Sequence, residues 1–164
     1  MNIVWMEHNS PLGTMVLAAC DYGLIGAWFV GQAHFAGPQA EWRADPAAPL
    51  LQQAARQLDE WFAGARRGFD LPLAPHGTPF RQAVWNEIAR IDYGQTRAYG
   101  SLAAALGRPH AARAVGAATG RNPWSIIVPC HRLIGRDGSL TGYAGGLERK
   151  RELLGFEAGR VRFA

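Results

Sequence analysis

A stretch rich in proline and glycine, residues 69–78, constrains the fold of this chain most, because it separates two halves with different patterns. Before it, short apolar runs are bounded by turn signals, and residues 14–30 predict a β-hairpin. After it, apolar residues recur mostly at helical spacing. We therefore expect two domains, residues 1–75 and 76–164, in a chain of 164 residues.

The first half predicts one small sheet and one helix. Strands are expected over residues 2–6 and 14–20, followed by a loop over residues 31–48 that is rich in glycine, proline and alanine. Residues 50–65 carry apolar side chains at helical spacing. Two arginines and Gly68 follow, and we expect them to end this helix, since cations and glycine favour helix C-termini.

The second half predicts four helices. Thr78-Pro79 is a favourable helix start, with threonine as the cap and proline in the first turn, and this helix is expected to reach about Arg90. Two short helices over residues 101–106 and 110–119 flank a turn that contains glycine, which is typical of a helix-turn-helix motif. The last helix is expected over residues 148–157.

The charge of the chain is unevenly distributed. Residues 1–79 carry four basic residues against seven acids, a net charge of −3, whereas residues 80–164 carry thirteen against six, a net charge of +7. Sixteen of the seventeen basic residues are arginines, which suit phosphate contacts. This asymmetry favours a polyanion-binding surface on the second half, although arginine codon usage in a GC-rich genome would give the same composition.

The cysteines and histidines exclude some classes of protein. The two cysteines, Cys20 and Cys130, lie far apart, so we expect no disulfide-stabilised secreted scaffold, and a reducing cytoplasm is the expected compartment. The histidines show no paired spacing with either cysteine, and no metal site is predicted. The chain also shows no secretory signal and no apolar run near the roughly 20 residues of a membrane span.

The motif with the clearest chemistry begins at Pro129, which must end the apolar strand predicted over residues 126–129. Cys130 then starts a turn. A thiol is mostly protonated at neutral pH, so a nucleophilic cysteine needs a base and benefits from a cation. His131 and Arg132 follow directly and are candidates for the base and the cation. For an isolated Cys-His pair, a buried and inert cysteine is the favoured interpretation.

Several motifs together carry a family resemblance. They are Thr78-Pro79-Phe80 with Val84-Trp85, Tyr99-Gly100, Ala112-Arg113-Ala114-Val115-Gly116, Arg121-Asn122-Pro123, Ile127-Val128-Pro129-Cys130-His131-Arg132 and Tyr143-Ala144-Gly145-Gly146-Leu147. In order and spacing, residues 78–157 resemble the O6-alkylguanine-DNA alkyltransferases, or methylated-DNA–protein-cysteine methyltransferases. The resemblance implies an α/β N-terminal ribonuclease-H-like domain and a mostly α C-terminal winged helix-turn-helix domain. The first 75 residues match this family only in outline.

The resemblance also implies a reaction. Cys130 would take the alkyl group from O6-alkylguanine in DNA, irreversibly and once per molecule, with O4-alkylthymine left open as a substrate. His131 would deprotonate Cys130 through a bound water, and Glu157 would orient His131, with Glu152 as a nearby competitor. Tyr99 would hydrogen-bond the guanine. No cofactor or metal is implied, and the target base would be flipped out of the duplex.

Further roles come only from the resemblance. Asn122 would tie the recognition helix to the active-site strand. Contacts to double-stranded DNA are implied for Tyr99, Ala112, Arg113, Ala114, Gly116 and Arg121, with Arg113 filling the gap left by the flipped base. The substrate pocket would comprise Tyr143, Ala144, Leu133 and Trp124. The expected form is a monomer, and cooperative binding along DNA is left open.

Two departures from the family pattern and three alternative functions remain. Trp124 stands where a smaller apolar residue is expected, and the first half lacks the cysteines that larger relatives use for metal or phosphotriester chemistry.

The alternatives are a damage-binding protein without chemistry, a helix-turn-helix regulator, and a Cys-His hydrolase with many turnovers. The non-catalytic damage binders carry tryptophan in place of the cysteine, so Cys130 argues against that class.

Overall fold

The protein is described by a computed structural model that covers residues 2–163. The chain forms two compact units, one built from residues 2–76 with Phe163 and the other from Gly77–Arg162. The predicted fold class is confirmed: a mixed sheet with a helix forms the first unit, and helices dominate the second.

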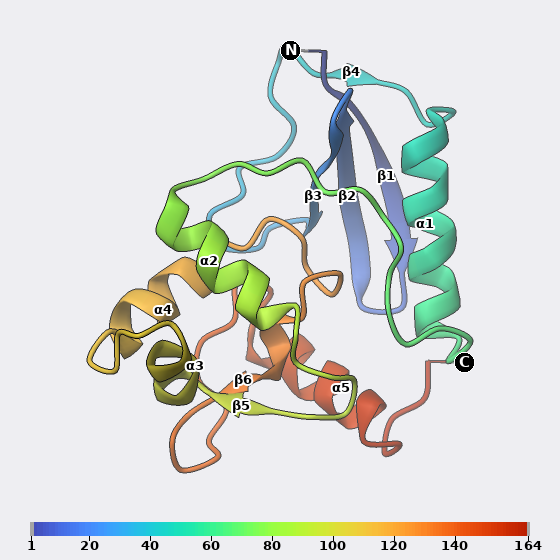
Figure 1. The fold of residues 1–164 in the computed structure, drawn as a ribbon. Coiled ribbons are helices and arrows are strands. Elements are labelled where there is room, and N and C mark those ends of the chain that lie inside the picture. Colours follow the sequence, from blue (N-terminus) through green and yellow to red (C-terminus); the bar gives the residue numbers. More distant parts are fainter. Residues whose placement is uncertain (1, 164) are drawn as a thin grey trace. The chain divides into compact units, whose positions relative to one another are not determined.

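The first unit is a four-stranded sheet with one helix against it (Figure 1). The sheet order is β3-β2-β1-β4, with β1–β2 and β2–β3 antiparallel and β4 parallel to β1. The elements are β1 (Val4–Ser10), β2 (Gly13–Cys20), β3 (Gly23–Phe29), β4 (Arg43–Ala44) and α1 (Pro49–Phe62). The predicted hairpin is thus present as β2 and β3.

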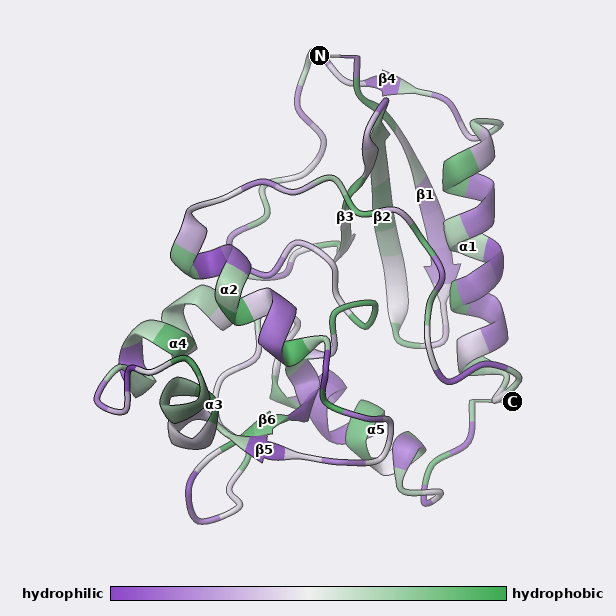
Figure 2. Ribbon diagram, viewed as in Figure 1, coloured by the Kyte–Doolittle hydropathy of each residue, from purple (hydrophilic) through white to green (hydrophobic). Residues whose placement is uncertain are grey.

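Helix α1 buries one stripe of its surface against the sheet. Its colouring alternates between hydrophilic and hydrophobic along the helix (Figure 2), and Leu51, Ala54 and Leu58 are completely buried. This spacing of three and four residues is the periodicity that predicted the helix. The helix is therefore stabilised mainly by its apolar face, with Trp61 in the same stripe.

The predicted end of α1 is wrong. The helix ends at Phe62, and Gly64 follows with φ of +78° and its N–H donating to the carbonyl of Trp61. Glycine adopts this left-handed conformation at little cost, so Gly64 and not Gly68 terminates the helix.

Residues 69–78 are also more ordered than a linker. Leu73 forms a parallel bridge with Leu24 of β3. The Leu24 N–H donates to the carbonyl of Pro72 at 2.8 Å, and the Ala74 N–H donates to the carbonyl of Leu24 at 3.0 Å. Proline prevents a longer strand here because it has no N–H to donate, but the alternate residues still extend the edge of the sheet.

The second unit is a group of four helices with a short two-stranded sheet. Its elements are α2 (Pro79–Ile88), β5 (Arg97–Ala98), α3 (Tyr99–Ala105), α4 (Ala112–Gly120), the 3-10 turn η1 (Cys130–Arg132), β6 (Leu133–Ile134) and α5 (Leu147–Glu157). Strands β5 and β6 pair in parallel. The Thr78 hydroxyl accepts from the Arg81 N–H at 3.2 Å, so the predicted cap of α2 is present. Among residues 2–163, no helix is long and apolar enough to cross a membrane.

The strand predicted over residues 126–129 is wrong. These residues form a tight turn in which Ile126 has φ of +71° and the Val128 N–H donates to the carbonyl of Trp124 at 2.9 Å. A strand would need a neighbouring strand to bond its backbone groups. Here the side chain of Asn122 takes that place, donating to the carbonyl of Val128 and accepting from the Trp124 N–H.

Candidate active site

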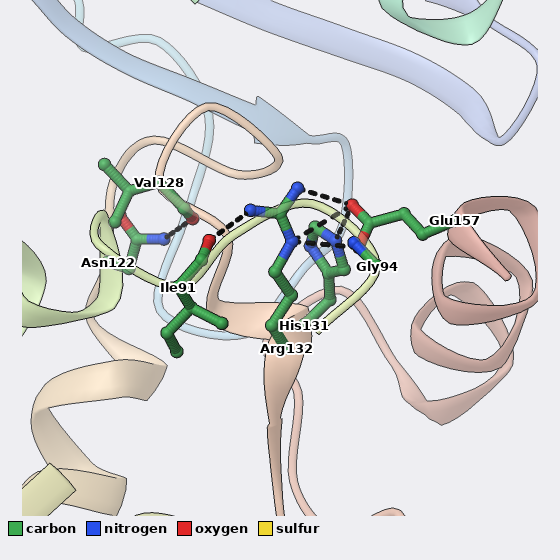
Figure 3. Close-up of polar contacts among 7 residues, drawn as sticks. All are labelled: Ile91, Gly94, Asn122, Val128, His131, Arg132 and Glu157. Atoms are coloured by element: carbon green, nitrogen blue, oxygen red, sulfur yellow. Dashed lines mark hydrogen bonds and ion pairs between the residues drawn. The ribbon is translucent and has the colours of Figure 1, made fainter. Parts of the chain in front are cut away.

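Cys130 starts the turn η1 and is nearly enclosed, with 4% of its surface exposed. The Asn122 side-chain amide donates to its Sγ at 3.2 Å and to the carbonyl of Val128 at 2.9 Å. Figure 3 shows the second of these bonds. Since Asn122 is the second residue after the end of α4, the amide links this helix to the turn that carries the cysteine.

The thiol is protonated at neutral pH in this environment. Burial raises the pKa of Cys130 to about 11, although the hydrogen bond from Asn122 and the charge of Lys150 act in the opposite direction. A thiolate is the reactive form of a cysteine. Any reaction at Cys130 therefore needs a neighbouring base that removes its proton at the moment of attack.

His131 directly follows Cys130 in η1 and is the predicted base. Its side chain is fully buried, and its Nε2 lies 2.9 Å from a carboxylate oxygen of Glu157, whose side chain is only 2% exposed (Figure 3). Burial lowers the pKa of His131 below its usual value, although the Glu157 carboxylate acts against this change. A neutral imidazole donates Nε2–H to Glu157 and keeps Nδ1 as the proton acceptor. Glu157, and not the competitor Glu152, pairs with His131.

The structure contradicts the role predicted for Arg132, which was the cation beside the Cys130 thiol. Its guanidinium does not face the cysteine: Nη2 donates to Glu157 at 2.7 Å, Nε donates to the same carboxylate at 2.9 Å, and Nη1 donates to the carbonyl of Ile91 at 2.6 Å (Figure 3). Burial of Glu157 raises its pKa, but the hydrogen bonds and charges of His131 and Arg132 outweigh this effect and lower it to about 2. The carboxylate is therefore charged at physiological pH. His131 and Arg132, which are consecutive in η1, both contact the Glu157 carboxylate, and the sequence alone does not show that geometry.

Lys150 is the cation whose charge lowers the pKa of the thiol, and it was not predicted from the sequence. It lies in α5 and is completely buried, with Nζ donating to the carbonyl of Thr141 at 2.8 Å. Burial lowers the pKa of its amine to about 8, while Cys130 acts to raise it. One signal existed, because Lys150 is the single lysine in a chain with sixteen arginines.

Tyr99 and Lys150 hold the same loop. Tyr99 lies in the first turn of α3, and its hydroxyl donates to the carbonyls of Thr141 and Gly142 at 3.1 and 3.4 Å. Lys150 donates to these two carbonyls as well and stands 5.7 Å from the centre of the Tyr99 ring. Both side chains thus fix the segment that leads into Tyr143.

Tyr143 buries its hydroxyl, for which no described residue provides a hydrogen-bond partner. Burial raises the pKa of this phenol well above its usual value, and a thiolate at Cys130 acts in the same direction. Ala144 follows in the same loop and is half-buried. A buried donor without a partner is costly, so this hydroxyl is suited to a polar ligand atom.

The other predicted pocket residues lie in the core. Leu133 is fully buried in β6. Trp124 is 4% exposed, and its ring packs edge-on against Trp85 with centroids 5.6 Å apart. The indole N–H of Trp85 donates to the carbonyl of Ala118 at 2.8 Å, so this aromatic pair anchors α2 to α4.

The outer surface of α4 carries the predicted DNA contacts. Val115 and Ala118 are buried, whereas Arg113 and Ala114 are exposed, and Ala112 and Gly116 are half-buried. Arg121, directly after the helix, is exposed too. The helix thus presents one arginine among small side chains to solvent. Among residues 2–163, no group of three or more potential metal ligands comes together.

The fold and the site define a class of protein: two short helices, α3 and α4, joined by a turn, in one unit with a buried cysteine that is followed directly by the histidine of an imidazole–carboxylate pair. Comparison with known proteins identifies the family. Residues 3–75 match the sequence model for the ribonuclease-like domain of 6-O-methylguanine DNA methyltransferase, and residues 79–159 match the model for its DNA binding domain. The chain belongs to the 6-O-methylguanine DNA methyltransferase family.

Characterised relatives agree with this assignment over nearly the whole chain. A methylated-DNA–protein-cysteine methyltransferase of Methanosarcina barkeri is 46% identical over 155 residues, covering 94% of this chain and 96% of the relative. One from Mycobacterium tuberculosis is 45% identical and covers 93% and 91% of the two chains. The crystal structure of Mycobacterium tuberculosis OGT in complex with DNA superposes with a TM-score of 0.88, at 42% identity and 99% and 96% coverage.

Proposed function

We propose that this protein repairs DNA by direct reversal, as a stoichiometric methylated-DNA–protein-cysteine methyltransferase. Cys130 accepts the alkyl group from O6-alkylguanine in double-stranded DNA, once and irreversibly. The observation that carries the proposal is the buried Cys130, followed directly in η1 by His131, whose imidazole contacts the Glu157 carboxylate. The membership of the family and the DNA-bound relative support it.

The reaction is a displacement at the alkyl carbon. His131 takes the Cys130 proton, through a bound water, and Glu157 stabilises the imidazolium that forms. The thiolate then attacks the alkyl carbon, the C–O6 bond breaks, and its electron pair leaves with guanine. Tyr99 stabilises the leaving guanine by a hydrogen bond, for which its hydroxyl must turn away from the Thr141 carbonyl. The product is a thioether, which has no easy reversal, so each molecule reacts once.

The target atom lies inside the duplex, so the base must leave the stack. Flipping costs a few kcal/mol of unstacking and unpairing. Arg113 is exposed on α4 and would enter the stack in place of the lost base, while the small neighbours Ala112, Ala114 and Gly116 allow close approach to the minor groove. Affinity would come mainly from phosphate contacts, since lesions occur in any sequence.

The proposal includes a compartment, an oligomeric state and a second substrate. Two free cysteines favour a reducing compartment, the cytoplasm. A monomer suffices, because Cys130, His131, Glu157 and the α4 surface all belong to one unit of one chain. Activity on O4-alkylthymine belongs to the same proposal.

The decisive experiment measures the intact mass of the protein after incubation with excess duplex DNA that contains O6-methylguanine. We expect a gain of one CH₂ that saturates at one per chain, and no gain in Cys130→Ser, which should still bind DNA. The matched control Cys20→Ser should gain the same mass as the wild type. Lesion binding without any mass change would instead indicate a non-catalytic damage binder, and many turnovers would indicate a hydrolase.

A second experiment tests base flipping. Arg113→Ala should slow repair of duplex DNA much more than reaction with a free O6-alkylguanine base, which needs no flipping. The control Arg121→Ala removes a nearby exposed charge outside the helix and should weaken duplex binding only modestly. Equal losses on both substrates in Arg113→Ala would exclude the flipping role.

A further inference from the structure

The Glu157 carboxylate accepts more hydrogen bonds than one histidine requires. Its Oε2 faces His131 Nε2 at 2.9 Å and Arg132 Nη2 at 2.7 Å, and its Oε1 accepts from Arg132 Nε at 2.9 Å and from the Gly94 N–H at 3.3 Å. Arg132 is itself fixed by the carbonyl of Ile91 and by the Tyr93 ring, whose centre lies 5.6 Å from Cζ. Both Glu157 oxygens are therefore held by a guanidinium that is only 7% exposed.

This arrangement limits what Glu157 can do. Both oxygens of this carboxylate accept hydrogen bonds from a buried guanidinium. Such a carboxylate does not readily accept a proton, because protonation would leave the arginine charge unpaired. Glu157 can therefore accept a hydrogen bond from His131 but is a poor proton acceptor. The proton of Cys130 must remain on the imidazole.

The charges around His131 act in both directions. Arg132, its neighbour in η1, and Lys150 in α5 lower the pKa of the imidazole, whereas Glu157 in α5 raises it. The other titratable groups nearby, Cys130 and Tyr143, have raised pKa values and are neutral at physiological pH. Arg132 therefore offsets part of the effect that Glu157 alone would have on the histidine.

We propose that Arg132 is a positioning residue for the alkyl transfer: it locks the Glu157 carboxylate as an anion that orients His131, and its charge keeps the imidazole neutral and able to accept the cysteine proton. This inference rests on the proposed function. Arg132 acts through Glu157 and His131 and does not contact the reacting atoms.

The test is the pH dependence of the rate of methyl transfer from free O6-methylguanine base, followed by intact mass. In Arg132→Gln the pKa of His131 should rise, so the acidic limb of the profile should move up by about one pH unit. Because Arg132→Gln also loses the bidentate bond to Glu157, its rate at pH 9 should fall as far below wild type as that of Arg132→Lys, and below the limb it should be about 10-fold lower again. Arg132→Lys keeps the charge but loses the bidentate bond to Glu157. The acidic limb of its pH–rate profile should therefore stay at the wild-type pH, while the rate falls at every pH.

The outcomes separate the two proposals. A folded Arg132→Gln protein whose profile keeps the wild-type shape would overturn the role of Arg132, because a structural defect lowers the rate without moving the limb. If Arg132→Gln does not fold, Arg132→Lys decides: a rate equal to wild type would overturn the positioning role. The control Arg151→Gln changes an exposed α5 arginine that pairs with Glu148 and should match wild type. A wild-type protein that takes no methyl group at any pH would instead contradict the proposed function.

Discussion

At the scale of the residue, the site depends on how a few buried side chains share charge. Cys130 needs its proton removed, and the cation that favours its thiolate is Lys150, which is distant in sequence. Burial lowers the pKa of Lys150 to about 8, so its charge is present at neutral pH and is lost above that value. The nucleophile is thus assisted most below about pH 8.

Replacing Lys150 by methionine should make the thiol less reactive. The variant loses the charge that lowers the pKa of Cys130, so alkylation by iodoacetamide should be slower than in the wild type, and the difference should be largest below pH 8. The rate is measured by mass spectrometry of Cys130. Arg151→Met serves as control because this α5 side chain is exposed. An unchanged rate in Lys150→Met would mean that another group supplies the charge.

Asn122 should matter for stability as much as for reactivity. Asn122→Ala leaves the carbonyl of Val128 and the N–H of Trp124 without their partner in a buried turn. Lost bonds of this kind cost about 1–3 kcal/mol each, so Tm should fall by roughly 5 °C or more. The control Asn9→Ala removes an exposed bond to Thr14 and should change Tm little. Equal Tm values for the two variants would contradict the importance of the turn.

At the scale of the element, features that depend on neighbouring residues could be predicted from the sequence. Backbone hydrogen bonds to distant residues could not. The cap at Thr78 and the hairpin turn before Gly23 depend on neighbouring residues, and both were predicted. Strand β1 continues to Ser10 although its last residues are polar, because β2 bonds its backbone throughout. The apolar run at residues 126–129 predicts a strand, because the sequence does not reveal that the Asn122 side chain bonds the backbone of this turn. Likewise, Cys130 and His131 stand out in the sequence, whereas Lys150 reaches them only through the fold.

The start of α2 gives a test at this scale. Thr78→Ala removes the acceptor for the Arg81 N–H, which should destabilise the protein by about 1 kcal/mol. Thr78→Ser keeps the hydroxyl and should retain most of the stability. Chemical unfolding in urea measures both variants. If serine failed to preserve the stability, the methyl group of threonine and not the cap would be responsible.

At the scale of the whole molecule, the distribution of charge predicts how DNA binding responds to salt. The basic residues gather in the second half, where Arg121 and Arg108 are exposed beside α4, and the first half is acidic. Each phosphate contact releases counterions, so the logarithm of the association constant should fall steeply with the logarithm of salt concentration. Arg121→Ala should reduce that slope by about one, because one phosphate contact is lost.

An exposed arginine of the first half provides the matched comparison. Arg56 lies on the outer side of α1, and Arg56→Ala changes the net charge by the same amount as Arg121→Ala. If phosphates contact only the second unit, Arg56→Ala leaves the slope unchanged, because the slope counts local contacts and not net charge. Fluorescence anisotropy with undamaged duplex over a range of salt concentrations measures both variants. Equal changes in slope would mean that both units bind the DNA backbone, and a flat response in the wild type would exclude a phosphate-dominated interface.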